Sequence, residues 1–248
     1  MTTINDLIQG IFLGGLFALF ACGLSLMFGV MNVINLAHGD AAVAAVYLAV
    51  VLIPATHIHA LWIFLPVVPI FAIGGYLLQR FFIQKSLDSG AITTLLVTFG
   101  LSVVIENVLL EVFTANSHSL DVGKLVSGSF KITNQIFIPY LSLVILGAAL
   151  VVLSALQLFL ARTRTGRMVR AVADDREAAR LVGANYRHLY GIAAALAFGS
   201  VAFAGLALGM YTSVAPSTGP TYLLYGFEAV VIGGLGSLWG TLIGGMVL

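Results

Sequence analysis

The sequence predicts an all-α, polytopic integral membrane protein with about seven or eight transmembrane helices, some of them short or broken. Hydrophobic residues make up 60% of the 248 residues, charged residues make up 8%, and the mean hydropathy is +1.08. A soluble domain carries about 25% charged residues, so this chain lacks the polar side chains to cover a surface in water. Its apolar runs approach the length of about 20 residues that a helix needs to cross a bilayer. They lack the alternation of a membrane barrel.

The candidate membrane spans follow one another along the chain, which we expect to form a single transmembrane domain over 1–248. The first run has no basic residue before it, so we expect an uncleaved span rather than a signal peptide. The second run is short, which indicates a tilted helix or part of a broken one. The first six runs are 7–30, 41–55, 61–79, 91–113, 136–160 and 189–212.

A seventh apolar stretch, 222–248, is interrupted by the sequence GGLGS. Successive glycines weaken a helix, so we expect a short helix, a turn and a second short helix. Gly233, Gly234 and Gly236 are expected to allow tight packing and a hinge, and Gly234→Leu is expected to clash with neighbouring backbone. The last run reaches Leu248 without a charged or aromatic anchor, from which we expect a C-terminal truncation.

The distribution of Lys and Arg predicts the orientation of the chain. Loop 162–188 should be cytoplasmic, because it contains more Lys and Arg residues than any other loop. The loop expected on the opposite side of the membrane has only Lys124 and Lys131. The N-terminus is then outside, and the chain is a multi-pass protein of the cytoplasmic membrane in contact with lipid. The basic residues of the loop are Arg162, Arg164, Arg167, Arg170, Arg176, Arg180 and Arg187.

Loop 162–188 also carries the signals of two short helices. Thr165 is the candidate cap of a helix over 166–173. Asp175 is suited to cap a second helix, and Glu177 lies in its first turn, where the helix dipole favours an anion. By these local signals alone, the segment is a positive-inside loop with a surface helix.

The second short helix has a face made of small side chains. Ala178, Ala179 and Val182 are expected to lie on or near one side of it. Gly183 is placed to end the helix and to turn the chain back toward the membrane. A face of this kind fits a groove on a partner protein. The basic residues that we expect to pair with acidic groups around such a groove are Arg180 and Arg187.

Polar residues cluster just before the second apolar run, in the sequence NVINLAHGD at 32–40. Asn35 and Asp40 can satisfy free backbone amides where the chain turns at the edge of the membrane. His38 and Asp40 do not predict a metal site, because two ligands are too few and the sequence has no second cluster of Cys and His. We expect no metal.

Two further carboxylates fall within apolar runs, Glu106 and Glu228. An ionisable group inside the membrane indicates a functional site or a buried partner. For Glu228 a simpler interpretation is a carboxylate near the interface that bonds to backbone or water. No catalytic constellation or nucleotide-binding motif is present in the sequence, so no catalytic or cofactor-binding residue is expected.

Four blocks of sequence resemble the branched-chain amino acid (LIV-type) permeases of ABC transporters, a family that includes related amide and urea permeases. The blocks occur in the family's order and together span nearly the whole chain. Two departures are an arginine at 176, where the family often has proline, and a glutamate at 106, where it often has glutamine. The blocks are GLSLMFGVMNVINLAHGD at 23–40, TFGLSVVIEN at 98–107, EAARLVG at 177–183 and YGFEAVVIGGLGSLWGTLIGG at 225–245.

The resemblance implies the membrane-spanning subunit of an ATP-driven bacterial importer for branched-chain or related amino acids, amides or urea. It implies a second homologous permease, cytoplasmic ATPase subunits, an extracytoplasmic (periplasmic) substrate-binding protein and a small-molecule substrate. ATP is then used by the partner ATPases, this chain binds no cofactor, and no nucleic acid is involved. Alternating access would move the substrate through a central pathway.

The resemblance also implies roles for individual residues. The helix with the EAA sequence would be the segment that couples the ATPase to the pore, through Asp175, Glu177, Ala178, Ala179, Arg180 and Gly183. The candidates for the pathway or for a helix break are Asn35, His38, Asp40, Glu106, Glu228, Gly233, Gly234 and Gly236.

Two other classes of function stay open on sequence alone. A secondary transporter or channel would work without an ATPase and would need a coupling-ion site among Asp40, Glu106 and Glu228. An integral-membrane enzyme is disfavoured, because the sequence lacks clustered His, Asp or Cys residues. Capture of an ATPase through loop 162–188 would separate the importer from both.

Overall fold

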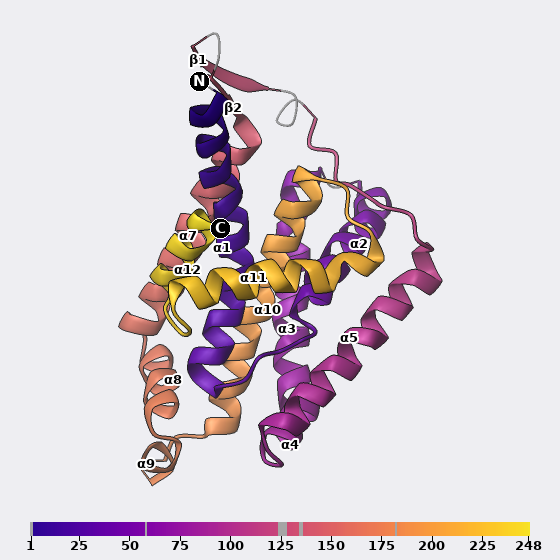
Figure 1. The fold of residues 1–248 in the computed structure, drawn as a ribbon. Coiled ribbons are helices and arrows are strands. Elements are labelled where there is room, and N and C mark those ends of the chain that lie inside the picture. Colours follow the sequence, from indigo (N-terminus) through magenta and orange to yellow (C-terminus); the bar gives the residue numbers. More distant parts are fainter. Residues whose placement is uncertain (1, 58, 124–127, 134–135, 182) are drawn as a thin grey trace.

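The computed structural model describes residues 2–57, 59–123, 128–133, 136–181 and 183–248, and its architecture is a helical bundle (Figure 1). Six of the described helical segments are long and apolar enough to cross a membrane, or up to seven if the bent pair α11–α12 counts as one span. The all-α class is confirmed. The helices are α1 Thr2–Met31, α2 His38–Thr56, α3 Phe64–Leu78, α4 Gln84–Leu87, α5 Ala91–Phe113, α7 Tyr140–Arg162, α8 Arg164–Asp174, α9 Arg176–Leu181, α10 Tyr186–Tyr211, α11 Gly219–Gly233 and α12 Leu238–Val247.

Several helices begin or end a few residues from the expected positions, and at two of these boundaries a different element is present. The third span continues beyond residue 79, through a π-helical turn (η2, Gln79–Ile83), into α4. The expected span 136–160 starts late, because Ile136–Pro139 forms strand β2, which pairs antiparallel with β1, Ser129–Thr133. Both strands are rich in β-branched and aromatic residues, which favour a pleated strand over a helix. This hairpin was not among the elements expected from the sequence.

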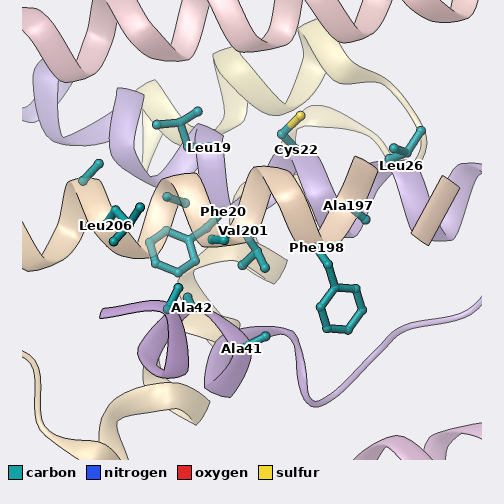
Figure 2. Packing of buried hydrophobic residues seen from close by; sticks show 14 of the residues in the cluster. Leu19, Phe20, Cys22, Leu26, Ala41, Ala42, Ala197, Phe198, Val201 and Leu206 are labelled. Atoms are coloured by element: carbon teal, nitrogen blue, oxygen red, sulfur yellow. The ribbon is translucent and has the colours of Figure 1, made fainter. Parts of the chain in front are cut away.

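The core of the bundle lies between α1, α10 and α2. Buried residues make up 72% and 78% of the spanning windows of α1 and α10, against 17% in α5. Small residues bring these helices together, since a Cβ on Gly205 of α10 would overlap the backbone of Ala42 in α2. Figure 2 shows Phe20 of α1 beside Ala42 and Val201, all three of which belong to the same buried cluster. The central helices therefore pack by close backbone approach.

Helix α2 starts inside the bundle rather than at its edge. The chain leaves the end of α1, where Asn32 has a φ of 53°, and returns through residues 33–37 toward α11 (Figure 1). A Cβ on Gly39 would overlap the carbonyl oxygen of Gly219, so the first turn of α2 touches the first turn of α11. Asn35, His38 and Asp40 are thus buried between helices, whereas Asn32 is exposed.

The predicted break between α11 and α12 is present, and the two helices meet at 112°. Ser237 caps α12 by accepting a hydrogen bond from the amide of Gly240 at 3.1 Å. Gly233 is tightly packed, because a Cβ there would overlap the backbone of Gly240. Apart from its chain neighbours, none of the described residues has an atom within 4 Å of a Cβ placed on Gly234, so the expected clash of Gly234→Leu with neighbouring backbone is wrong. The φ of 93° at Gly234 is instead what disfavours a side chain.

Candidate functional site

The interior polar site is centred on Asp40, in the first turn of α2. The hydroxyl of Ser102 on α5 donates a short hydrogen bond to Oδ2 of Asp40, while Oδ1 has no hydrogen-bond partner among the described residues. Glu106 lies one turn beyond Ser102 on α5 and is half-buried. The structure thus brings Asp40 to the side of α5 that carries Ser102 and, one turn further on, Glu106. Asp40 does not cap α2, contrary to one interpretation of the sequence.

Helix α5 supplies the polar wall of this site. Although most of the helix is exposed, Thr94, Thr98 and Ser102 are buried and repeat every four residues. The hydroxyls of Thr94 and Thr98 donate to the carbonyl oxygens of Gly90 at 3.2 Å and Leu95 at 3.1 Å. A threonine or serine commonly bonds to its own helix in this way. Ser102 differs from them because it bonds to another helix, a contact that sequence analysis missed.

His38 lies against the opposite wall of the site. Its ring meets the edge of Phe198 on α10 with 6.2 Å between ring centroids. A Cβ on Gly23 of α1 would come within 2.6 Å of the imidazole, so only glycine leaves room for it. Within the described part of the chain, neither ring nitrogen has a hydrogen-bond partner. The described residues also contain no group of three or more His, Cys, Asp or Glu side chains suited to hold a metal ion.

Asn35 fixes the turn of the chain that precedes α2. Its side-chain oxygen accepts a hydrogen bond from the amide of Ala37 at 3.0 Å, and its amide nitrogen lies 3.8 Å from the sulfur of Met27. Asn35 is fully buried. A side chain that bonds to a backbone amide two residues ahead fixes a local turn. Asn35 therefore shapes the segment that carries His38 and Asp40 into the bundle.

Glu228 lies apart from the Asp40 cluster. It is half-buried on α11 and lines a cavity of about 360 Å³ with Phe227, Val231 and Leu248 among others. It is nine residues beyond Gly219, which corresponds to about 13–14 Å along a helix. The glycine turn lies further on in the same direction. The structure therefore divides the predicted pathway residues into two groups.

The short helix α9 forms largely as its sequence predicts. Oδ1 of Asp175 accepts hydrogen bonds from the amides of Glu177 and Ala178, each at 2.9 Å, so Asp175 caps the helix. Gly183 has a φ of 88°, a conformation that favours glycine. The cap of α8 is Thr163, which accepts from the amide of Gly166 at 2.9 Å. The expected cap at Thr165 is therefore wrong. Val182 lies outside the described residues.

The small residues of α9 do not form one outward face. Ala179 is 5% exposed and packs into the core, whereas Ala178 is exposed. The expectation that both lie on a docking face is wrong, because successive helical residues point about 100° apart. Leu181, which the sequence interpretation passed over, is 89% exposed. The surface that α9 offers to another molecule includes Glu177, Ala178, Arg180 and Leu181.

Arginines connect α9 to the rest of the bundle. The Nη2 atoms of Arg176 and Arg187 lie 3.7 and 3.5 Å from the carboxylate of Asp88, in the turn before α5. The guanidinium of Arg180 lies 5.6 Å from the ring centroid of Tyr186. Arg187 also donates to the hydroxyl of Tyr186 at 3.1 Å. Arg187 was expected to face a partner; in the structure it binds within the chain.

The apolar helices and the broken helix pair are those of a polytopic membrane protein, with a buried polar site inside the bundle and a short capped helix at one end. The chain belongs to the family described as "Branched-chain amino acid transport system / permease component", whose sequence profile matches residues 7–248. It is thus a membrane-spanning permease subunit of the LIV-type ABC importers. The alternative of a secondary transporter or channel is set aside by this membership.

Two full-length relatives are branched-chain amino acid permeases. The chain is 26% identical over 258 residues to the high-affinity branched-chain amino acid transport system permease protein BraD of Pseudomonas aeruginosa and to LivH of Escherichia coli K12, covering 99% of this chain and 83% of each relative. It is 35% identical over 127 residues to the fructose import permease protein FrcC of Rhizobium meliloti, covering 48% of this chain and 34% of that protein. No solved structure matches the chain significantly.

The Asp40–Ser102 bond gives a testable prediction. Ser102→Ala removes the donor and leaves a buried carboxylate oxygen without its partner, which costs about 1–3 kcal/mol. We expect Ser102→Ala to lower the Tm of the purified chain and its uptake activity. The matched control is Ser200→Ala, because Ser200 is equally buried but donates only to its own helix, to Ala197 at 2.8 Å. Equal losses in both variants would contradict the special role of the α2–α5 bond.

Proposed function

We propose that this chain imports branched-chain amino acids across the bacterial cytoplasmic membrane. The observation that carries the proposal is the match over nearly the whole chain to two permeases that are named for branched-chain amino acids. The similarity to the fructose permease covers only about half of the chain. A second homologous permease, cytoplasmic ATPase subunits and an extracytoplasmic binding protein complete the importer. ATP binds to the ATPases, and this chain itself holds no cofactor.

In this proposal α9 receives the motion of the ATPase. Support comes from its position at one end of the bundle beside α8 (Figure 1) and from the exposed side chains of Glu177, Ala178 and Leu181. The contacts of Arg176 and Arg187 with Asp88 join this end to the start of α5. Helix α5 then reaches Asp40 through Ser102. Motion at α9 would pass by this chain of contacts to α2.

The substrate pathway is proposed to pass the start of α2 and α11. Both helices begin inside the bundle, and helix N-termini of discontinuous segments can face the carboxylate of a substrate. Asn35, His38, Asp40 and Glu106 belong to this region. Glu228 and the turn at Gly233, Gly234 and Gly236 are proposed to act elsewhere, as the hinge between α11 and α12.

The proposed orientation has the N-terminus outside and α8 and α9 in the cytoplasm. Asn185→Cys, in a background in which the buried Cys22 is replaced by alanine, tests it. Residue 185 is exposed between α9 and α10. We expect the cysteine to resist an impermeant thiol reagent added to intact cells and to react after the membrane is opened. Rapid labelling of intact cells would reverse the topology.

Uptake by the complete importer tests the proposed substrate. The chain is reconstituted with ATPase, binding-protein and second permease subunits of the proposed importer, and labelled leucine, valine, urea and fructose are compared. We expect ATP-dependent uptake of leucine and valine at least tenfold above that of urea and fructose. Uptake without the ATPase, or a preference for urea or fructose, would refute the proposal.

A further inference from the structure

A cavity separate from the Asp40 site lies at the end of the bundle that carries α8 and α9. It is bordered by α1, α7, α8, the turn between α11 and α12 and the start of α12, it is partly open to the surface, and its volume is about 180 Å³. Its lining contains the polar side chains of Ser25, Gln157 and Arg170. The apolar lining includes Leu26, Leu160 and Leu238. The cavity therefore combines one cationic group with neutral polar groups and an aliphatic wall.

The polar groups of the cavity are incompletely bonded. Ser25 is 0% exposed, and its hydroxyl has no hydrogen-bond partner within the described ranges. A buried hydroxyl without a partner is unfavourable unless a ligand or water bonds to it. Arg170, in contrast, is exposed at the mouth of the cavity, and its one hydrogen-bond contact with the described residues runs from Nη2 to the carbonyl oxygen of Ala161 at 3.5 Å. This is beyond the usual hydrogen-bond length, and a guanidinium has five N–H donors.

The composition of the lining selects the chemistry of a ligand. A guanidinium binds a carboxylate through two parallel hydrogen bonds, and the hydroxyl of Ser25 and the amide of Gln157 supply further donors. Among the described residues no Asp or Glu lines the cavity, so a cationic group would find no counter-charge there. The volume is below the roughly 300–1,000 Å³ of pockets for drug-sized ligands. We infer that this cavity binds a small aliphatic carboxylate, held by Arg170 and Ser25.

The position of the cavity gives such a ligand a mechanical consequence. Arg170 lies on α8, which leads directly into α9, whereas Leu238 begins α12 after the glycine turn. A bound acid therefore ties α8 to α1 and to the hinge between α11 and α12. The binding itself is independent of the proposed transport function, so failure of one leaves the other standing.

Binding of 4-methylpentanoate to the purified full chain tests the inference. The chain is placed in phosphatidylcholine nanodiscs, and calorimetry and the shift in Tm report binding. We expect Arg170→Gln and Ser25→Ala each to weaken the Kd at least tenfold. Arg167→Gln is the matched control, because Arg167 is also on α8 and donates to a carbonyl oxygen near the end of α7, that of Arg162 at 3.1 Å, but does not line the cavity. It should bind like the wild type.

Neutral and lipid controls make each result decisive. The neutral 4-methylpentanamide should bind at least tenfold more weakly than the acid, and binding of the acid should persist when phosphatidylglycerol is added to the nanodiscs. Absence of binding, equal affinity for the amide, or an equal effect of Arg167→Gln would overturn the inference. Loss of acid binding in phosphatidylglycerol would assign Arg170 to a lipid headgroup and overturn it as well. Ser25→Ala decides the matter if Arg170→Gln does not fold.

Discussion

Leu181→Asp is expected to abolish ATP-driven uptake while the chain remains folded and inserted in the membrane. Leu181 is 89% exposed at the end of α9, so its replacement disturbs few contacts within the chain. A carboxylate in the proposed ATPase contact would have to lose its water without a partner, which is costly. Truncation at the centre of an interface can cost about 2 kcal/mol or more, and a buried charge adds to this.

Uptake and capture of the ATPase together test the Leu181 prediction. Wild-type amounts of chain in the membrane, combined with lost uptake and lost capture, would support docking through α9. Met168→Asp is the control, because Met168 is an exposed apolar residue on the neighbouring helix α8. Normal uptake by Leu181→Asp would mean that the arginine-rich loop 162–188 only orients the chain in the membrane and does not dock the ATPase. Ala179→Arg is unsuitable for this test, because Ala179 is buried in the core and its replacement would destabilise the fold.

Gly183 is a second test of the same helix. Its φ of 88° is adopted routinely by glycine and only occasionally by Asn or Asp, and a side chain there costs roughly 1–2 kcal/mol. Apart from its two chain neighbours, no described residue has an atom within 4 Å of a Cβ placed on Gly183, so the expected cost is one of backbone conformation. Gly183→Asp should therefore alter the end of α9 without disturbing the core of the bundle.

Features set by neighbouring residues in sequence could be predicted, and contacts between distant segments could not. The cap at Asp175 and the break after Gly233 depend on a few adjacent residues, and both are present in the structure. The bond between Asp40 and Ser102 joins residues 62 positions apart. No local pattern distinguishes Ser102 from the other hydroxyl residues on its side of α5. Which alanine of α9 is buried likewise depends on the helices that pack against it.

The largest difference between the expected and the observed structure is that α2 begins inside the bundle rather than at the membrane edge. The short apolar run indicated a tilted or broken helix. The depth in the bundle at which α2 begins, however, depends on the return of residues 33–37 into the bundle. Asn35 fixes that turn through the amide of Ala37, and Gly39 allows contact with α11. The sequence shows a polar asparagine and a glycine there, both of which also suit a turn at the membrane edge. Whether the turn lies at the membrane edge or inside the bundle is therefore decided by tertiary packing.

Gly39→Ala is expected to destabilise the chain and to abolish uptake. In an ordinary helix this change is favourable by about 1 kcal/mol, because alanine is the better helix former. Here a Cβ would overlap the carbonyl oxygen of Gly219, a backbone atom that cannot rotate away, and overpacking typically costs about 1–3 kcal/mol. The helices α2 and α11 must separate, which also moves Asp40 relative to Ser102. Steric overlap should therefore outweigh helix propensity.

Gly147→Ala is the matched control for Gly39→Ala, because Gly147 is also within a helix, α7, and a Cβ placed there would meet no atom of another described segment within 4 Å. We expect it to raise the Tm slightly and to leave uptake unchanged, whereas Gly39→Ala lowers both. Thermal unfolding of the purified chains and uptake by the reconstituted importer measure the two effects. If both variants gain stability alike, α2 and α11 do not touch at Gly39 and Gly219, and the interior start of α2 is wrong. A Gly39→Ala chain that is stable but inactive would instead place the contact in the transport cycle rather than in the stability of the fold.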